Sequence, residues 1–117
     1  MNKVGRSFRN SFRGLKKAYK KDLSFQLEVW AGLALCAVGY YFWPLLNLEL
    51  VLLVFSYFFV LSTELLNTSI EEALGHLHPE SHERIGTSKD IASAAVLMAV
   101  LFSVFSVLLI AYNHLLA

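Results

Sequence analysis

This sequence has almost no cysteine and none of the familiar phosphate-binding motifs. Cys36 is the only cysteine, so no intramolecular disulfide can form, and its apolar surroundings favour a packing role. No glycine-rich kinase loop or dinucleotide fingerprint occurs, and residues 86–89 (Gly-Thr-Ser-Lys) have the wrong order for a Walker loop. His76, His78 and His82 match no closed zinc motif. Any phosphate or metal chemistry must therefore be built from other residues.

Charge is also absent from long stretches of the chain. Hydrophobic residues make up 56% of the sequence and the mean hydropathy is +0.54. A domain of 117 residues could not bury so much apolar surface in water. In lipid, a helix of about 20 apolar residues spans the bilayer and pairs its own backbone groups. We therefore predict an all-α membrane protein, a single domain over residues 1–117, with transmembrane helices at about 29–46, 50–72 and 91–113.

The Lys and Arg residues gather near the N-terminus. Eight of the ten lie between Lys3 and Lys21, ahead of the first acid, Asp22. They occupy one half of a helical wheel, and apolar residues occupy the other half. This pattern predicts a basic amphipathic helix over residues 1–23 on a bilayer with anionic lipids, not on nucleic acid; packing against a partner protein is the alternative. The apolar face comprises Val4, Phe8, Phe12, Leu15, Tyr19 and Leu23.

The other two cations predict how the chain crosses the membrane. Arg84 and Lys89 lie in the segment 72–90, whereas the short 47–49 turn and the C-terminal tail carry no Lys or Arg. Loops rich in Lys and Arg stay on the cytoplasmic side of a membrane. We therefore expect the N-terminus and the 72–90 loop to be cytoplasmic, and the C-terminus to lie on the outer side of the inner membrane.

A polar stripe interrupts the second apolar run. Glu64, Asn67 and Glu71 are spaced by three and four residues, so they share one helix face near the expected cytoplasmic end. Carboxylates are costly inside a bilayer and usually functional there. The alternative is that the stripe only joins helices, which Asn67 alone could do. Two acids without a cation between them would join helices poorly. Glu72 points about 100° away from the stripe and is expected to be exposed.

A second polar cluster precedes the third span. It runs from Glu80 through Ser81 and His82 to Glu83, and it ends at Lys89-Asp90. Lys89 could neutralise a phosphate, although snorkelling at a helix end is the alternative. Asp90 could hold Lys89 or cap the third transmembrane helix. Ser93 follows Lys89 by one turn. Together the two clusters contain what phosphoryl transfer needs, namely a base, carboxylates for Mg²⁺ and cations for phosphates.

These motifs resemble those of the prokaryotic diacylglycerol kinase and undecaprenol kinase family. The resemblance rests on the block 64–71 (Glu-Leu-Leu-Asn-Thr-Ser-Ile-Glu), on residues 80–82, and on the block 89–96 (Lys-Asp-Ile-Ala-Ser-Ala-Ala-Val). Weaker similarity through residues 12–16 and Phe25 extends it to nearly the whole chain. It implies a bacterial homotrimer of three-span subunits, each with a surface helix, and active sites formed between neighbours.

The resemblance also implies a role for each matching residue. Glu64 would be the general base that takes the proton of the lipid hydroxyl, and Asp22 and Glu71 would hold Mg²⁺ bound to ATP. The residues implied in ATP binding are Asn10, Asp22, Glu71, Glu80, His82, Lys89 and Asp90. Those implied near the lipid substrate are Arg13, Glu28, Asn67 and Ser93.

Three positions depart from the family pattern. Asp22 stands where the family usually has Glu, so its carboxylate reaches one methylene less far. Gln26 replaces a common Arg, and Gly75 occupies a position that is usually Asp. These departures leave the proposed base and both proposed metal ligands in place, and they bear on turnover and substrate preference.

We therefore expect an ATP- and Mg²⁺-dependent lipid kinase that phosphorylates the primary hydroxyl of diacylglycerol to give phosphatidic acid. Undecaprenol is the alternative substrate, because it presents the same hydroxyl chemistry. A small proton- or cation-coupled transporter is an alternative of another class, since intramembrane acids also suit that role. A non-catalytic assembly factor would leave the Glu64, Asn67 and Glu71 stripe without a purpose.

Overall fold

The protein is entirely helical over the residues that its computed structural model describes, 2–80 and 82–117. Met1 and Ser81, the latter part of the second polar cluster, lie outside the described residues. The helices are α1 (Lys3–Lys21), α2 (Leu23–Tyr41), α3 (Asn47–Leu77) and α4 (Glu83–Leu115). Three of them, α2, α3 and α4, are long and apolar enough to cross a membrane. The predicted all-α class, with one amphipathic helix and three candidate spans, is confirmed.

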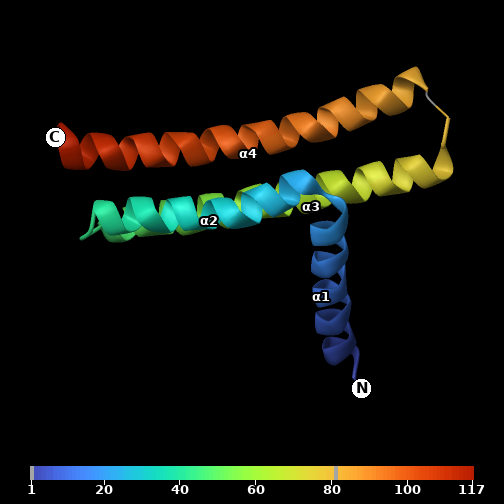
Figure 1. Cartoon of the computed structure of the whole chain (residues 1–117), viewed down its shortest axis with the longest axis horizontal. Coiled ribbons are helices and arrows are strands. Elements are labelled where there is room, and N and C mark those ends of the chain that lie inside the picture. The colour runs from blue at the N-terminus through green and yellow to red at the C-terminus, as the bar shows by residue number, and fades with distance from the viewer. Residues whose placement is uncertain (1, 81) are drawn as a thin grey trace.

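Helix α1 points away from the other three helices and is joined to them at the Asp22 junction (Figure 1). Its first turn is capped by Asn2, whose side chain accepts a hydrogen bond from the Gly5 N–H at 2.7 Å. The apolar face is exposed, with Phe8 and Phe12 each about two-thirds accessible. An apolar face left uncovered in this way fits a helix that lies in a membrane interface.

Helix α3 is the centre of the packing, because both α2 and α4 lie against it. Figure 1 shows α4 running along the layer that α2 and α3 form. The fully buried positions of α3 and α4 include Ser56, Ala99 and Ser106, small residues that let helix backbones approach closely. On the other side of α3, the Tyr57 hydroxyl donates to the Val29 carbonyl of α2 at 2.9 Å.

Close approach of α2 and α3 also depends on Gly32. A Cβ atom at this position would lie 2.9 Å from ring atoms of Tyr57, closer than side-chain carbons approach one another. The missing side chain leaves room for the Tyr57 ring beside α2. This contact fixes α2 on α3 and so positions the start of α2, which carries Glu28.

The helix ends differ from the uncharged runs of the sequence. The first run reaches residue 46, but α2 begins at Leu23 and ends at Tyr41, and Pro44 stands in the non-helical link that follows. Proline cannot continue a helix, whereas it does not interrupt an apolar run. Most of the segment 72–90, expected to be a loop, is helical, because α3 continues to Leu77 and α4 begins at Glu83.

The early start of α4 changes the interpretation of Asp90. The N-cap of α4 is His82, whose Nδ1 accepts a hydrogen bond from the Arg84 N–H at 3.1 Å. Asp90 therefore lies two turns inside the helix, and the suggestion that it caps this helix was wrong. The mostly polar residues 83–90 extend α4 at its N-terminal end beyond its apolar part, which hydropathy alone does not reveal.

Candidate active site

Residues from three helices and the α1–α2 junction meet around one polar cavity of about 280 Å³, which we call the acidic cavity. Residues far apart in the sequence meet here because α2 and α4 both pack on the stripe face of α3. Six of the residues predicted for the site are among those that line it. The lining consists of Asp22, Ser24, Glu28, Glu64, Asn67, Glu71, Ser93 and Val96.

The stripe on α3 forms one wall of the acidic cavity. Glu64 and Asn67 are buried, with 4% and 8% of their surfaces exposed, whereas Glu71 is exposed one turn further on. The Asn67 Nδ2 donates to Glu71 Oε1 at 3.4 Å, a long hydrogen bond. The spacing of these three residues thus places them on one side of α3, facing α2 and α4.

Two buried oxygen atoms at the cavity have no hydrogen-bond partner among the described residues. They are Oε2 of Glu28 and Oδ1 of Asn67. Buried acceptors are almost always satisfied in folded proteins, so an orphaned pair at one cavity needs an explanation. A bound cation, or a ligand that donates hydrogen bonds, would satisfy both atoms.

Asp22 is held at the edge of the cavity by two contacts. It caps α2, since its Oδ1 accepts a hydrogen bond from the Ser24 N–H at 2.9 Å. Its Oδ2 accepts a hydrogen bond from the Thr68 hydroxyl of α3 at 2.7 Å. Burial raises the pKa of Asp22, but the hydrogen bonds from Thr68 and from the Ser24 N–H outweigh burial, so the pKa lies below its usual range.

The charge of the cavity suits a magnesium ion bound to phosphates. Asp22, Glu28, Glu64 and Glu71 supply four carboxyl groups, and no Lys, Arg or His lines the cavity in the described part of the chain. Within the described ranges, no three acidic, His or Cys side chains are close enough together to hold a metal ion alone. Mg²⁺ commonly takes one or two carboxylates and completes its shell with water and substrate phosphates. The donor set therefore fits Mg²⁺ that arrives with a nucleotide.

Glu72 does not belong to the acidic cavity. It is exposed, as the helical geometry predicts, and forms an ion pair with Lys21 at the end of α1. The pair joins the α1–α2 junction to α3 one turn beyond the contact between Thr68 and Asp22. Ser24 and Thr68 were not predicted for this region. A serine two residues after an acid at a helix junction is a recognisable capping pattern, but nothing local marks Thr68.

The remaining predicted residues lie away from the cavity. Asn10 and Arg13 are exposed on α1, and Glu80 lies in the short link between α3 and α4. His82 caps α4 and is exposed. Lys89 is half-buried and Asp90 exposed on the first turns of α4. A single chain does not bring these six residues to the lining of the acidic cavity.

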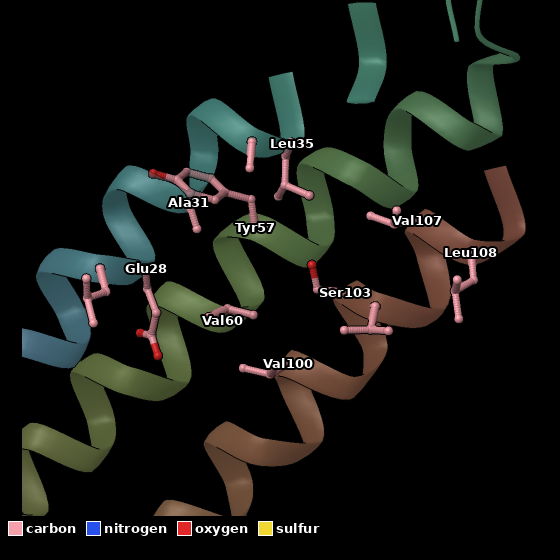
Figure 2. Close-up of a pocket in the computed structure, with 12 residues that line it drawn as sticks. Glu28, Ala31, Leu35, Tyr57, Val60, Val100, Ser103, Val107 and Leu108 are labelled. Carbon is pink, nitrogen blue, oxygen red and sulfur yellow. The ribbon is translucent and has the colours of Figure 1, made fainter. Parts of the chain in front are cut away.

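An apolar groove of about 460 Å³ opens beside the acidic cavity. Residues of α2 line one side and residues of α4 the other, with α3 running between them, as Figure 2 shows. Glu28 lines both the groove and the acidic cavity. In Figure 2, Glu28 lies at one end of the groove and Leu108 at the other. A ligand with a polar head and an apolar chain could therefore occupy both spaces. The other labelled residues are Ala31, Leu35, Tyr57, Val60, Val100, Ser103 and Val107.

Comparison with known proteins gives one consistent answer. Residues 9–111 match the family model of prokaryotic diacylglycerol kinase. The diacylglycerol kinase of Escherichia coli K12 is 34% identical over 106 residues, which cover 89% of this chain and 84% of the relative. That of Haemophilus influenzae is 31% identical over 93 residues, covering 80% of this chain and 78% of the relative. The chain belongs to the prokaryotic diacylglycerol kinase family.

Proposed function

We propose that this lipid kinase transfers the γ-phosphoryl group of ATP to the primary hydroxyl of diacylglycerol, producing phosphatidic acid and ADP. The observation that carries the proposal is the acidic cavity joined to an apolar groove at Glu28. The cavity suits Mg²⁺ and phosphates, and the groove suits an acyl chain. Both relatives are named diacylglycerol kinases, which supports this choice of lipid.

In the proposed mechanism Glu64 is the general base. Its carboxylate takes the proton of the lipid hydroxyl, whose oxygen attacks the γ-phosphorus as the bond to ADP breaks. Glu64 is buried, so water is largely excluded from the proton that moves. Asn67, one turn further along α3, is positioned to orient the hydroxyl beside Glu64, and Glu28 and Ser93 line the same space.

Asp22 and Glu71 are the proposed ligands of Mg²⁺, which neutralises phosphate charge when it is bound with ATP. They come from the α1–α2 junction and from α3, so the site depends on how these two segments are packed. Asn10, Glu80, His82, Lys89 and Asp90 are proposed nucleotide contacts, and Arg13 is a proposed lipid contact. Because these residues lie outside the acidic cavity of one chain, a neighbouring subunit is expected to complete the site.

We further propose a homotrimer in the bacterial inner membrane. Large apolar side chains are exposed along all three candidate spans, among them Trp30, Phe58 and Phe105. Lipid and neighbouring subunits would both cover such surfaces. The distribution of Lys and Arg supports a cytoplasmic N-terminus and a cytoplasmic α3–α4 link, which brings ATP to the acidic cavity.

The deciding experiment compares two lipids in one assay. The purified protein in detergent micelles would receive ATP, Mg²⁺ and either diacylglycerol or undecaprenol, and ADP release would be followed, with Glu64→Gln as control. We expect release with diacylglycerol that is absent in the control. Release with undecaprenol alone would replace the proposed substrate. No release with either lipid from a folded trimer would contradict the proposed function.

A further inference from the structure

The Thr68 hydroxyl makes an unusual hydrogen bond. Serine and threonine inside helices commonly donate to a carbonyl of the preceding turn. Thr68 instead donates to the Oδ2 atom of Asp22, which lies 46 positions earlier in the sequence. Five other helical hydroxyl groups donate to their own helix, namely those of Ser11, Ser56, Thr63, Thr87 and Ser106.

This hydrogen bond restricts the rotation of the Asp22 side chain. The backbone of Asp22 is extended between two helices, and its Oδ1 is already engaged by the Ser24 N–H. The contact at 2.7 Å from Thr68 then settles the orientation of the carboxylate plane about its Cβ. Each oxygen keeps a lone pair for another partner, since a carboxylate accepts about four hydrogen bonds or metal contacts.

The position of Thr68 on α3 links this bond to the site. It follows Asn67 directly and lies one turn from Glu64, on the helix that supplies the wall of the acidic cavity. The ion pair between Lys21 and Glu72 lies one turn further on but is exposed at both side chains. Exposed ion pairs contribute little to the free energy of folding, so this pair holds the junction less firmly than the part-buried bond of Thr68.

We infer that Thr68 is a positioning residue that holds the Asp22 carboxylate for the metal–nucleotide complex. The inference rests on the proposed function, because it takes Asp22 as a metal ligand. Groups that hydrogen-bond to metal ligands typically change metal affinity by about 10- to 100-fold when removed. Thr68 does not touch the substrate in this arrangement; it acts through Asp22.

The test uses two substitutions at one position and a matched control on the same helix. Thr68→Val keeps the shape of the side chain and removes the hydroxyl, whereas Thr68→Ser keeps the hydroxyl. Thr63→Val is the control, since the Thr63 hydroxyl donates only to Phe59 and Val60 of its own helix. Mn²⁺ binding in the presence of a non-hydrolysable ATP analogue would be measured by electron paramagnetic resonance, alongside the Mg²⁺ and lipid dependence of ADP release.

We expect Thr68→Val to weaken Mn²⁺–nucleotide binding at least about tenfold and to raise the Mg²⁺ requirement, with the KM for lipid unchanged. Thr68→Ser and Thr63→Val should behave like the wild-type protein. Wild-type binding in Thr68→Val would overturn the inference and leave the proposed function standing. A wild-type protein that neither binds Mn²⁺ with the nucleotide analogue nor releases ADP would overturn both.

Discussion

Two buried glutamates on α3 have opposite surroundings, Glu49 in the first turn of the helix and Glu64 near its middle. Glu49 and Glu64 are 2% and 4% exposed. Glu49 is fully partnered: its Oε1 accepts from the Leu46 N–H at 2.8 Å and contacts His114 Nε2 at 2.9 Å, while Asn113 donates to Oε2 at 3.3 Å. Glu64 lines a cavity that holds three further carboxyl groups and no cation among its described lining residues.

The difference separates a structural acid from a functional one. A buried carboxylate with hydrogen bonds and a histidine is compensated, so it can join the start of α3 to the end of α4 without any ligand. The centroids of the Phe42 and His114 rings also lie 5.6 Å apart. Acidic side chains that lie close together inside a membrane protein without a cation usually mark a site where a ligand supplies the missing positive charge. The four predictions below test this contrast, in order of decreasing effect.

The largest effect is expected for Glu64→Gln, which keeps the shape of the side chain and removes the base. ADP release with saturating lipid should fall by at least about 100-fold, because general bases contribute about 10²- to 10⁴-fold. The proposed trimer, checked by size-exclusion chromatography, should stay intact. Glu49→Gln is the matched control and should keep kcat. Full activity in Glu64→Gln would refute the base assignment.

Glu71→Gln should act on the metal–nucleotide side of the reaction. We expect the Mg²⁺ and ATP concentrations needed for half-maximal rate to rise by about tenfold or more, since one charged metal ligand is lost. The KM for lipid should change much less. Titrations of Mg²⁺, ATP and lipid in the same micelles provide the measurement, and a selective rise in the lipid KM would contradict this role.

His114→Leu should remove the histidine partner of Glu49 at the start of α3. The substitution leaves Glu49 buried with fewer partners, which we expect to cost about 1–3 kcal/mol of stability. Thermal unfolding in detergent should show a lower midpoint, while kcat of the folded protein stays near the wild-type value. A large loss of kcat at unchanged stability would show that the surroundings of Glu49 are not separate in function from the acidic cavity.

Asp22→Glu should have the smallest effect. The longer carboxylate still reaches the cavity, so activity should be preserved or raised. The cap of α2 is weakened, because the capping preference is for Asp, Asn, Ser and Thr, and we expect a stability loss of at most about 1 kcal/mol. Kinetics and thermal unfolding of the variant check both points; a complete loss of activity would argue against Asp22 as a metal ligand.

Local patterns account for what was predicted correctly from the sequence. The uncharged runs gave three spans, because the transfer of apolar side chains into lipid depends on composition and length. The spacing of Glu64, Asn67 and Glu71 placed them on one helix face, because the α-helix has a fixed period. Helix ends were predicted less well, since α3 continues through residues 73–77 and α4 begins with the mostly polar residues 83–90, all outside the predicted spans.

Local sequence patterns could not predict the contacts between residues that lie far apart in the sequence. Glu49 and His114 lie 65 positions apart in the sequence, and no local pattern links them. The bond from Thr68 to Asp22 and the groove beside Glu28 carried no local signal.

The sequence by itself determined the helical class, the candidate spans, the basic amphipathic helix and the polar stripe, because each follows from the chemistry and spacing of neighbouring residues. Only the tertiary structure decided that Asp22 and Glu28 join the stripe around one cavity, and that Glu49 is compensated while Glu64 is not. The physical reason is that burial and charge compensation depend on which helix faces meet. Those contacts are set by side-chain packing over the whole chain.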